Sequence, residues 1–253
     1  MVTHAATGPA GQDTLLVSWA ALARLSAGAR LTRTEAAVAA VFPQCSALSN
    51  AILLDPVTTD TASGAAADLV ELYATAGVTS WALWLPTPVT DLDAPDEVHA
   101  VSGMTRDTTT LVMTLEVPCG LPSHPGVRRT PPATAGRAGD EPVPAADLPD
   151  PDGVAGLDAW VLVHDELAVV GAWSYLHGTD VGIYAVGTVP DRRRRGLART
   201  LMLHVLADAH RRGARTASLQ STRLGRPLYA SLGFRPTGRY EEWVPRRRSC
   251  EER

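Results

Sequence analysis

The segment from residue 181 to residue 219 constrains the fold of this chain more than any other. A run of β-branched and small residues, Val181 to Val189, predicts a strand. An amphipathic helix is predicted from about Gly196 to Arg212, and a further strand from Thr216 to Leu219. Strand, helix and strand in this order form a crossover between two parallel strands. We therefore expect a sheet that is at least partly parallel, with a helix packed on it.

The composition is that of an ordinary folded protein. The chain has 253 residues, of which 45% are hydrophobic and 20% charged, so it can form one large domain or two small ones. The three cysteines are far apart and the histidines have no ligand spacing, so we expect neither disulfides nor a metal site. No apolar run reaches about 18 residues and no signal peptide is evident, which favours a cytoplasmic protein without a membrane partner.

Charge is segregated along the chain. Residues 1–190 carry a net charge of −14 and residues 191–253 a net charge of +10, and every basic residue is an arginine. The absence of lysine excludes Schiff-base chemistry. A basic end raises the possibility of nucleic-acid binding, but no stacking aromatic residues alternate with these arginines. We therefore do not expect a nucleic-acid partner.

Proline content suggests how the chain is divided. Residues 118–151 contain 9 of the 19 prolines and no apolar periodicity, which predicts a linker over 118–157. It would separate an N-terminal domain, 1–117, from a C-terminal domain, 158–245, followed by a basic tail, 246–253. Helices are expected at Leu15–Leu25 and Thr34–Val41. The N-terminal region alternates strands and helices, and the C-terminal region has antiparallel strands that lead into one strand–helix–strand crossover, so the fold class is α/β with a mixed sheet.

The residues between the strand and the long helix suggest a binding site. The pattern Arg193-x-x-Gly196-x-Ala198 places unpaired backbone N–H groups at a helix N-terminus, where the positive end of the helix dipole favours a phosphate or pyrophosphate. Small residues at Gly196 and Ala198 leave the backbone accessible. Arg192 to Arg195 add positive charge, although a run of arginines is more often only a solvated surface.

This pattern resembles the coenzyme-A pyrophosphate loop of the GNAT acetyltransferase superfamily, including the preceding Val189-Pro190-Asp191. A second block, Leu228-Tyr229-Ala230-Ser231-Leu232-Gly233-Phe234, is similar to the block that ends the strand–helix unit of that superfamily. Together the two blocks extend the resemblance from Val181 to Trp243. It implies a GNAT-like fold that uses acetyl-CoA (coenzyme A).

The resemblance also implies roles for individual residues. The pantetheine arm would pair with the strand backbone, the pyrophosphate would bind the loop, and Ser221 would contact the pantetheine or the helix backbone. Tyr229 would be the general acid that protonates the departing thiolate. The residues implied in cofactor binding are Val186, Gly187, Thr188, Val189, Arg193, Arg194, Arg195, Gly196, Leu197, Ala198 and Ser221.

The chain departs from the superfamily pattern in two respects. The region before Ala159 leaves no room for the strand and helices that open a GNAT domain. The closest resemblance is to two-domain, mycothiol-synthase-like proteins, in which an eroded N-terminal copy has lost its coenzyme loop. No general base is identified, because the candidates are better explained as surface or loop residues: His177, Asp180, Tyr184, Glu241 and Glu242.

The function implied is an acetyl-CoA-dependent N-acetyltransferase. A primary amine of a small molecule or a peptide would attack the thioester directly, without a covalent enzyme intermediate. The alternative is a non-catalytic acyl-CoA-binding or regulatory module, favoured by the missing front elements and by the lack of an evident base.

Overall fold

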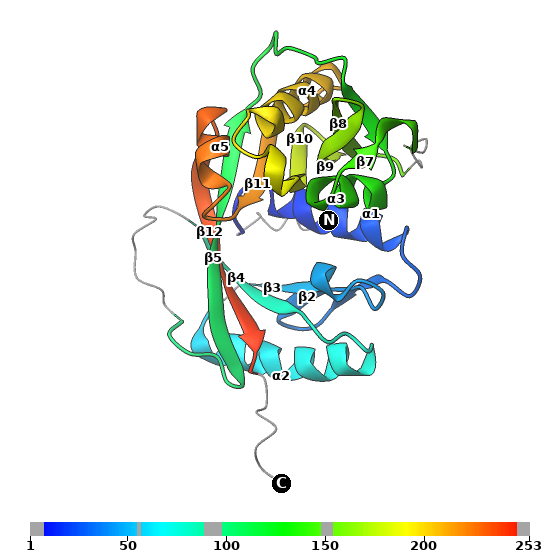
Figure 1. The fold of residues 1–253 in the computed structure, drawn as a ribbon. Coiled ribbons are helices and arrows are strands. Elements are labelled where there is room, and N and C mark those ends of the chain that lie inside the picture. The colour runs from blue at the N-terminus through cyan, green and yellow to red at the C-terminus, as the bar shows by residue number, and fades with distance from the viewer. Residues whose placement is uncertain (1–7, 55–56, 89–97, 148–153, 247–253) are drawn as a thin grey trace. The chain divides into compact units, whose positions relative to one another are not determined.

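The computed structural model describes residues 8–54, 57–88, 98–147 and 154–246 (Figure 1). Helices and a mixed sheet of parallel and antiparallel strands make up the fold, as expected for an α/β protein. The helices are α1 (Gln12–Ala23), α2 (Thr59–Thr75), α3 (Pro132–Asp140), α4 (Leu197–Arg211) and α5 (Arg226–Ser231). The strands are β1 (Arg30–Arg33), β2 (Ala37–Val41), β3 (Asn50–Leu53), β4 (Ala82–Pro88), β5 (Met104–Glu116), β6 (Val127–Thr130), β7 (Val143–Pro144), β8 (Leu157–His164), β9 (Leu167–His177), β10 (Asp180–Thr188), β11 (Thr216–Ser221) and β12 (Arg235–Pro245).

Two compact units make up the chain, and they interleave along the sequence. Unit 1 comprises residues 1–12, 19–112 and 236–253, and unit 2 comprises residues 13–18 and 113–235. Strand β5 begins in unit 1 and ends in unit 2, whereas β12 lies almost wholly in unit 1. Over the described ranges, none of the helices is both long and apolar enough to cross a membrane.

Unit 1 is built around a strand–helix–strand crossover. Its strand order is β1-β2-β3-β4-β12-β5, with β3 and β4 parallel and joined through α2. Helix α2 packs on β2 and β3. Its buried face consists of Ala62, Ala65, Ala66, Leu69 and Tyr73. The Tyr73 hydroxyl donates a hydrogen bond to the Ala40 carbonyl at 3.1 Å. This bond ties the helix to the sheet.

The helix predicted for Thr34–Val41 is wrong, because Ala37–Val41 forms β2. All five of its side chains are buried, and the strand pairs with β1 on one edge and β3 on the other. A short apolar run that is buried on both faces fits a strand as well as a helix, and long-range pairing decides between them. The helix predicted at Leu15–Leu25 is confirmed in its essentials by α1.

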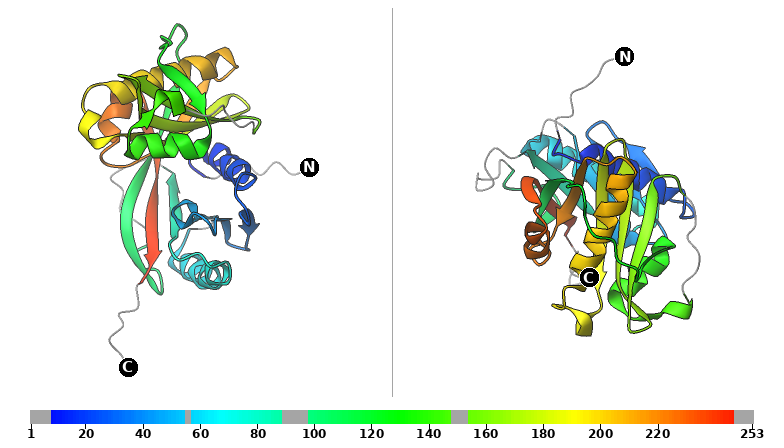
Figure 2. Two further views of the ribbon diagram at one scale, coloured as in Figure 1. Left: turned by 45° about the vertical axis from the view of Figure 1, so that its right-hand side comes forward. Right: turned by 90° about the horizontal axis from the view of Figure 1, so that it is seen from above.

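Unit 2 contains the predicted crossover from residue 181 to residue 219. Its strand order is β5-β11-β10-β9-β8-β6, and β7 pairs with β9. Strands β10 and β11 are parallel and are joined through α4, which buries Leu201, Met202, Val205 and Leu206. Helices α4 and α3 pack on opposite faces of β8, β9 and β10 (Figures 1 and 2).

Residues 127–144 differ from the sequence prediction, which expected no regular element there. They form β6, α3 and β7. Pro131 precedes α3 and Pro132 is its first residue, a position that tolerates proline because the first N–H of a helix is unpaired anyway. The buried residues of α3 are Ala135, Ala138 and Gly139, which are too small to produce a visible apolar pattern. The predicted basic tail, 246–253, lies outside the described residues except for Arg246.

Candidate functional site

Strands β10 and β11 pair over only part of their length. Parallel pairing runs from Asp180 opposite Thr216 to Ile183 opposite Leu219. Strand β10 continues to Thr188 and β11 to Ser221, with no further ladder pair between them in the described part of unit 2. The edge of β10 that faces β11 is therefore unpaired beyond Ile183. Val186, Gly187 and Thr188 lie on this free edge, and Val189 follows it.

The opposite edge of β10 stays attached to β9 through an irregularity. The register between the two strands shifts between Tyr184 and Gly187, and Ala185 has a φ of 51°. Pairing then resumes with Gly187 opposite Gly171. The Val189 amide donates to the Val169 carbonyl at 3.0 Å. A bulge of this kind redirects a strand and often lies beside a functional site.

The loop that follows leads into an uncapped helix. Arg194 has a φ of 63° and Gly196 a φ of 79°, and α4 begins at Leu197 without a side-chain hydrogen bond to its first turn. No hydrogen bond joins the amides of Arg194 to Ala198 to an acceptor among the residues described. Five consecutive donors, together with the positive end of a 15-residue helix, form a site for an anion.

Three of the four loop arginines have local partners. The Arg193 Nε donates to the Thr188 carbonyl at 2.9 Å, and an Arg195 guanidinium nitrogen donates to the Asp191 carbonyl at 3.1 Å. Arg192 pairs with Asp165 at 3.1 Å. Arg194 is exposed and has no such partner within the described residues. Arg193 and Arg195 therefore fix the loop backbone, and all four side chains keep the loop positive.

These features fit a cofactor that joins an extended polar arm to a pyrophosphate. The free edge of β10 offers the amides and carbonyls that an extended chain would pair with, as another strand does. The arm would lead directly into the donors of the loop. A Cβ atom at Gly196 would meet nothing within 4 Å, so its positive φ is the reason for glycine there. The residues predicted from the sequence to bind coenzyme A, except Ser221, thus lie along the end of β10 and the loop that follows it.

Ser221 and Tyr229 come from the elements that follow. Ser221 is buried at the end of β11, and its hydroxyl donates to the Thr222 carbonyl at 2.9 Å. Tyr229 lies on α5 with 8% of its surface exposed, and its ring meets Phe234 edge-on at 6.0 Å between centroids. Burial raises the pKa of Tyr229 to about 12. The phenol is therefore protonated at neutral pH.

Two of the base candidates in unit 2, Asp180 and Tyr184, are engaged in local structure, whereas His177 is exposed at the end of β9. The two oxygens of Asp180 accept hydrogen bonds from Thr216 at 2.8 Å and from Ser218 at 2.7 Å. The side chain of Tyr184 folds back over Gly182, where its hydroxyl is 1.9 Å from the position that a Cβ would take. Burial raises the pKa of Tyr184, so its hydroxyl stays protonated at neutral pH and is not available as a base.

The base candidates in unit 1 are similarly engaged. Glu241 is buried, forms ion pairs with Arg106 and Arg239, and accepts a hydrogen bond from Thr109 at 2.7 Å. Glu242 accepts a hydrogen bond from Thr110, and burial raises the pKa of its carboxyl.

No cluster of three His, Cys, Asp or Glu side chains suited to a metal is present in the described part of the chain.

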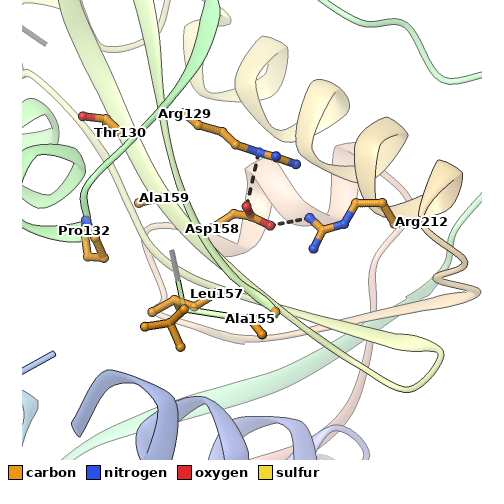
Figure 3. Close-up of a pocket in the computed structure, with 10 residues that line it drawn as sticks. Arg129, Thr130, Pro132, Ala155, Leu157, Asp158, Ala159 and Arg212 are labelled. Atoms are coloured by element: carbon orange, nitrogen blue, oxygen red, sulfur yellow. Dashed lines mark hydrogen bonds and ion pairs between the residues drawn. The ribbon is translucent and has the colours of Figure 1, made fainter. Parts of the chain in front are cut away.

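A separate pocket of unit 2, of about 370 Å³, contains none of the predicted site residues (Figure 3). It lies among the end of β6, the start of β8 and the end of α4. Asp158 forms ion pairs there with Arg129, at 3.2 Å, and with Arg212. Both arginines also contact Asp208, at 3.0 Å and 3.3 Å. Because each guanidinium is neutralised by carboxylates, the pocket lacks the free charge that would indicate a ligand.

Comparison with known proteins relates part of the chain to a protein family. Residues 156–236 match the family model described as an acetyltransferase (GNAT) domain. No curated protein matches the chain. A GCN5-related N-acetyltransferase from Kribbella flavida has a similar fold, with a TM-score of 0.65, 17% identity, and 96% of this chain and 98% of that chain covered.

Two further solved structures share the fold. A tandem GNAT protein from the clavulanic acid biosynthesis pathway has a TM-score of 0.54 at 15% identity, with 87% of this chain and 83% of that chain covered. A conserved protein of unknown function from Staphylococcus epidermidis has a TM-score of 0.55 at 8% identity, with 88% and 96% covered. At such identities the likeness concerns the fold alone. The matched segment, 156–236, contains both the free edge of β10 and the loop.

Proposed function

We propose that this chain, whose residues 156–236 match the acetyltransferase (GNAT) family model, transfers an acetyl group from acetyl-CoA to a primary amine of a small molecule or a peptide. One observation supports this most strongly: the free edge of β10 leads directly into five unpaired amides at the N-terminus of α4. Acetyl-CoA supplies the thioester carbon that the amine attacks, without a covalent enzyme intermediate.

Different residues would bind different parts of the cofactor. Val186 to Val189 would hold the pantetheine arm through their backbone groups. The amides of Arg194 to Ala198 would bind the pyrophosphate, with the exposed side chain of Arg194 adding charge. The bond from Arg193 to the Thr188 carbonyl would keep the strand end and the loop in a fixed relation. Ser221 would contribute its remaining hydroxyl lone pairs.

Tyr229 would stabilise the departing sulfur. A thiol has a pKa of about 8.5 in water, below the pKa of about 12 to which burial raises Tyr229, so complete proton transfer from the phenol to the thiolate is uphill. The hydroxyl would therefore first donate a hydrogen bond to the sulfur as negative charge develops, and transfer the proton late. This is a narrower role than a simple proton donor.

The acceptor amine must lose a proton before or during attack. In unit 2, Asp180 is hydrogen-bonded to Thr216 and Ser218, and burial keeps Tyr184 protonated at neutral pH. We propose that water carries this proton away from the amine. An enzyme of this kind reacts faster as the pH approaches the pKa of the acceptor amine, because the neutral amine is the nucleophile.

Unit 1 would be the eroded copy of the same domain, without a cofactor. Its crossover helix, α2, corresponds in order to α4, but Thr58 caps it: the Thr58 hydroxyl accepts from the Thr61 amide at 3.2 Å. Asp60 adds negative charge to the first turn. Both features oppose phosphate binding at this helix end.

Cys45 and Cys119 are free thiols, which supports a reducing, cytoplasmic location.

The proposal is tested by calorimetry of acetyl-CoA binding to the wild type and to Gly196→Glu. Residue 196 needs a positive φ, which costs other residues roughly 1–2 kcal/mol, and the new carboxylate would repel the pyrophosphate. We expect binding at least about 10-fold weaker. Gly178→Glu is the matched control, since Gly178 has a φ of 57° and lies in an exposed hairpin turn. Equal affinities for all three proteins would reject the assigned loop.

Activity is tested separately from binding. Release of free thiol from acetyl-CoA, measured with a panel of primary amines and with short peptides, should exceed the rate without an acceptor. Mass spectrometry of the acceptor should show one added acetyl group. Binding of acetyl-CoA without thiol release for any amine would instead favour the non-catalytic module.

A further inference from the structure

Two glycines face each other across β9 and β10 at the point where pairing resumes after the bulge. Gly171 and Gly187 are direct cross-strand partners. Neither has a positive φ, so backbone conformation does not require glycine at either position. Space does. A Cβ atom at Gly171 would lie 1.7 Å from the Ala135 carbonyl oxygen, and one at Gly187 would lie 2.9 Å from the Gly139 Cα.

Helix α3 therefore rests with its backbone directly on the backbone of the two strands. The contact is reciprocal, since a Cβ atom at Gly139 would lie 3.0 Å from the Gly187 Cα. Ala135 and Ala138 pack beside it in a small buried cluster with Ala159, Val161 and Ala168. The other end of the helix is held by Trp173 of β9, whose indole N–H donates to the Pro132 carbonyl at 2.9 Å.

The position of this contact matters because β10 has lost a neighbour there. Beyond Ile183 the strand has no β11 partner, and its ladder with β9 is interrupted between Tyr184 and Gly187. A strand segment that is paired on one edge only, next to a bulge, is easily displaced. Gly187 is the residue at which α3 presses on this segment from the face of the sheet.

We infer that α3 is a positioning element for the cofactor site. The backbone contact between Gly139 and Gly187 holds the free edge of β10, residues 186–189, in the place where it receives the extended arm of acyl-CoA. This inference rests on the proposed function and adds a residue, Gly139, that neither touches the cofactor nor belongs to the loop. It also explains why β9 and β10 carry glycines at paired positions, Gly171 and Gly187.

The test compares two alanine substitutions in the same helix. At Gly136 a Cβ atom would lie 3.9 Å from the Trp173 ring, an ordinary contact, whereas at Gly139 it would press on the Gly187 backbone. Both substitutions favour helix formation equally. By calorimetry, coenzyme A should bind Gly136→Ala as it binds the wild type, and should bind Gly139→Ala at least about 5-fold more weakly.

A second variant removes the support without crowding. Trp173→Phe deletes the hydrogen bond to the Pro132 carbonyl and should weaken coenzyme A binding in the same direction, by a smaller factor. Hydrogen exchange separates positioning from general loss of stability. In Gly139→Ala or Trp173→Phe, amides of residues 186–189 should exchange faster, while amides in the paired part of β11, residues 216–219, should not.

The outcomes are distinguishable from those for the proposed function. If the wild type does not bind coenzyme A, the proposed function fails. If the wild type binds it and Gly139→Ala and Trp173→Phe both bind it with unchanged affinity, the role of α3 is rejected and the proposed function stands. Faster exchange spread equally over residues 186–189 and 216–219 would likewise reject positioning.

Discussion

The side chain of Tyr229 is buried on a short helix, and burial raises its pKa to about 12. The hydroxyl therefore keeps its proton over the whole range in which proteins are assayed. A residue that acts only as a donor to a developing negative charge should affect turnover and leave cofactor binding unchanged. Tyr229 is therefore tested by comparing turnover, with an acceptor amine that supports thiol release, and acetyl-CoA binding.

Tyr229→Phe should lower kcat by roughly 100-fold, the low end of the range for losing one general acid. Its affinity for acetyl-CoA should equal that of the wild type. In the wild type, no loss of kcat attributable to Tyr229 should occur below about pH 11, because its pKa is about 12. Thiol release and calorimetry provide the two measurements.

Tyr73→Phe is the control for this substitution. Tyr73 is a buried tyrosine of unit 1 whose hydroxyl donates to the Ala40 carbonyl. Its replacement should reduce the free energy of unfolding by about 1 kcal/mol and leave kcat unchanged. If Tyr229→Phe also keeps its kcat, the role of Tyr229 in catalysis is refuted.

At the scale of residues, sequence patterns located the candidate loop but not its internal bonds. Position between a strand and a long helix was enough to single out Arg193 to Ala198. That Arg193 and Arg195 bond to the carbonyls of Thr188 and Asp191 follows from the turn at Arg194 and Gly196. Those bonds depend on positive φ values, and a run of four arginines does not indicate which of them will turn back.

Among the elements of unit 2, α4 is attached to its surroundings by a histidine. The Nδ1 atom of His204 accepts a hydrogen bond from the His124 amide at 3.0 Å, and its ring meets Trp160 edge-on at 5.6 Å. Burial lowers the pKa of His204. A protonated imidazole cannot accept this bond, so only the neutral form supports the contact.

Acid should therefore weaken unit 2 through His204. Because its pKa is lower in the folded state than in the unfolded chain, the unfolded state binds more protons and stability rises with pH. The contribution is present above about pH 6.5 and is lost as the pH falls through the folded pKa. Urea unfolding of the wild type at pH 7 and pH 5 should show this loss.

His204→Asn should reduce that pH dependence, because an amide oxygen accepts at both values of pH. The variant His177→Asn is the control, since His177 is exposed at the end of β9. It should leave the pH dependence as in the wild type. A loss between pH 7 and pH 5 that is equal in all three proteins would show that His204 is not its source.

The predictability of elements depended on how they are buried. Strands and helices with long alternating or amphipathic patterns, such as β10 and α4, were recognisable from the sequence. Strand β2 was not, because Ala37 to Val41 is buried on both faces and has no period. Helix α3 was not, because it packs through Ala135, Ala138 and Gly139. Its signals were Pro131-Pro132 and the spacing of these small residues.

The whole molecule contains two units with the same order of elements. In each, three strands are followed by a crossover helix and a strand parallel to the third, with β1-β2-β3-α2-β4 in unit 1 and β8-β9-β10-α4-β11 in unit 2. The places of β5 and β12 in the sheet could not be predicted from the sequence, because strand partners far apart in sequence are set by packing.

Charge is distributed unequally between the two crossovers. The helix of unit 2 begins beside exposed arginines and has no acid in its first turn, whereas the helix of unit 1 begins with Asp60 and a threonine cap. Both helices have the same dipole direction relative to their strands, so these side chains make the difference, and only the α4 end favours an anion. The end of α4 is therefore the one proposed to bind coenzyme A, and the equivalent end of α2 is not.

Hydrogen exchange with and without coenzyme A tests this claim most directly, because it reports both helix ends in one experiment. The amides of residues 194–198 have no acceptor among the described residues and should exchange quickly in the free protein. Coenzyme A should slow exchange at residues 186–198 and leave residues 58–61 unchanged. Protection at residues 58–61 without protection at residues 186–198 would contradict the account.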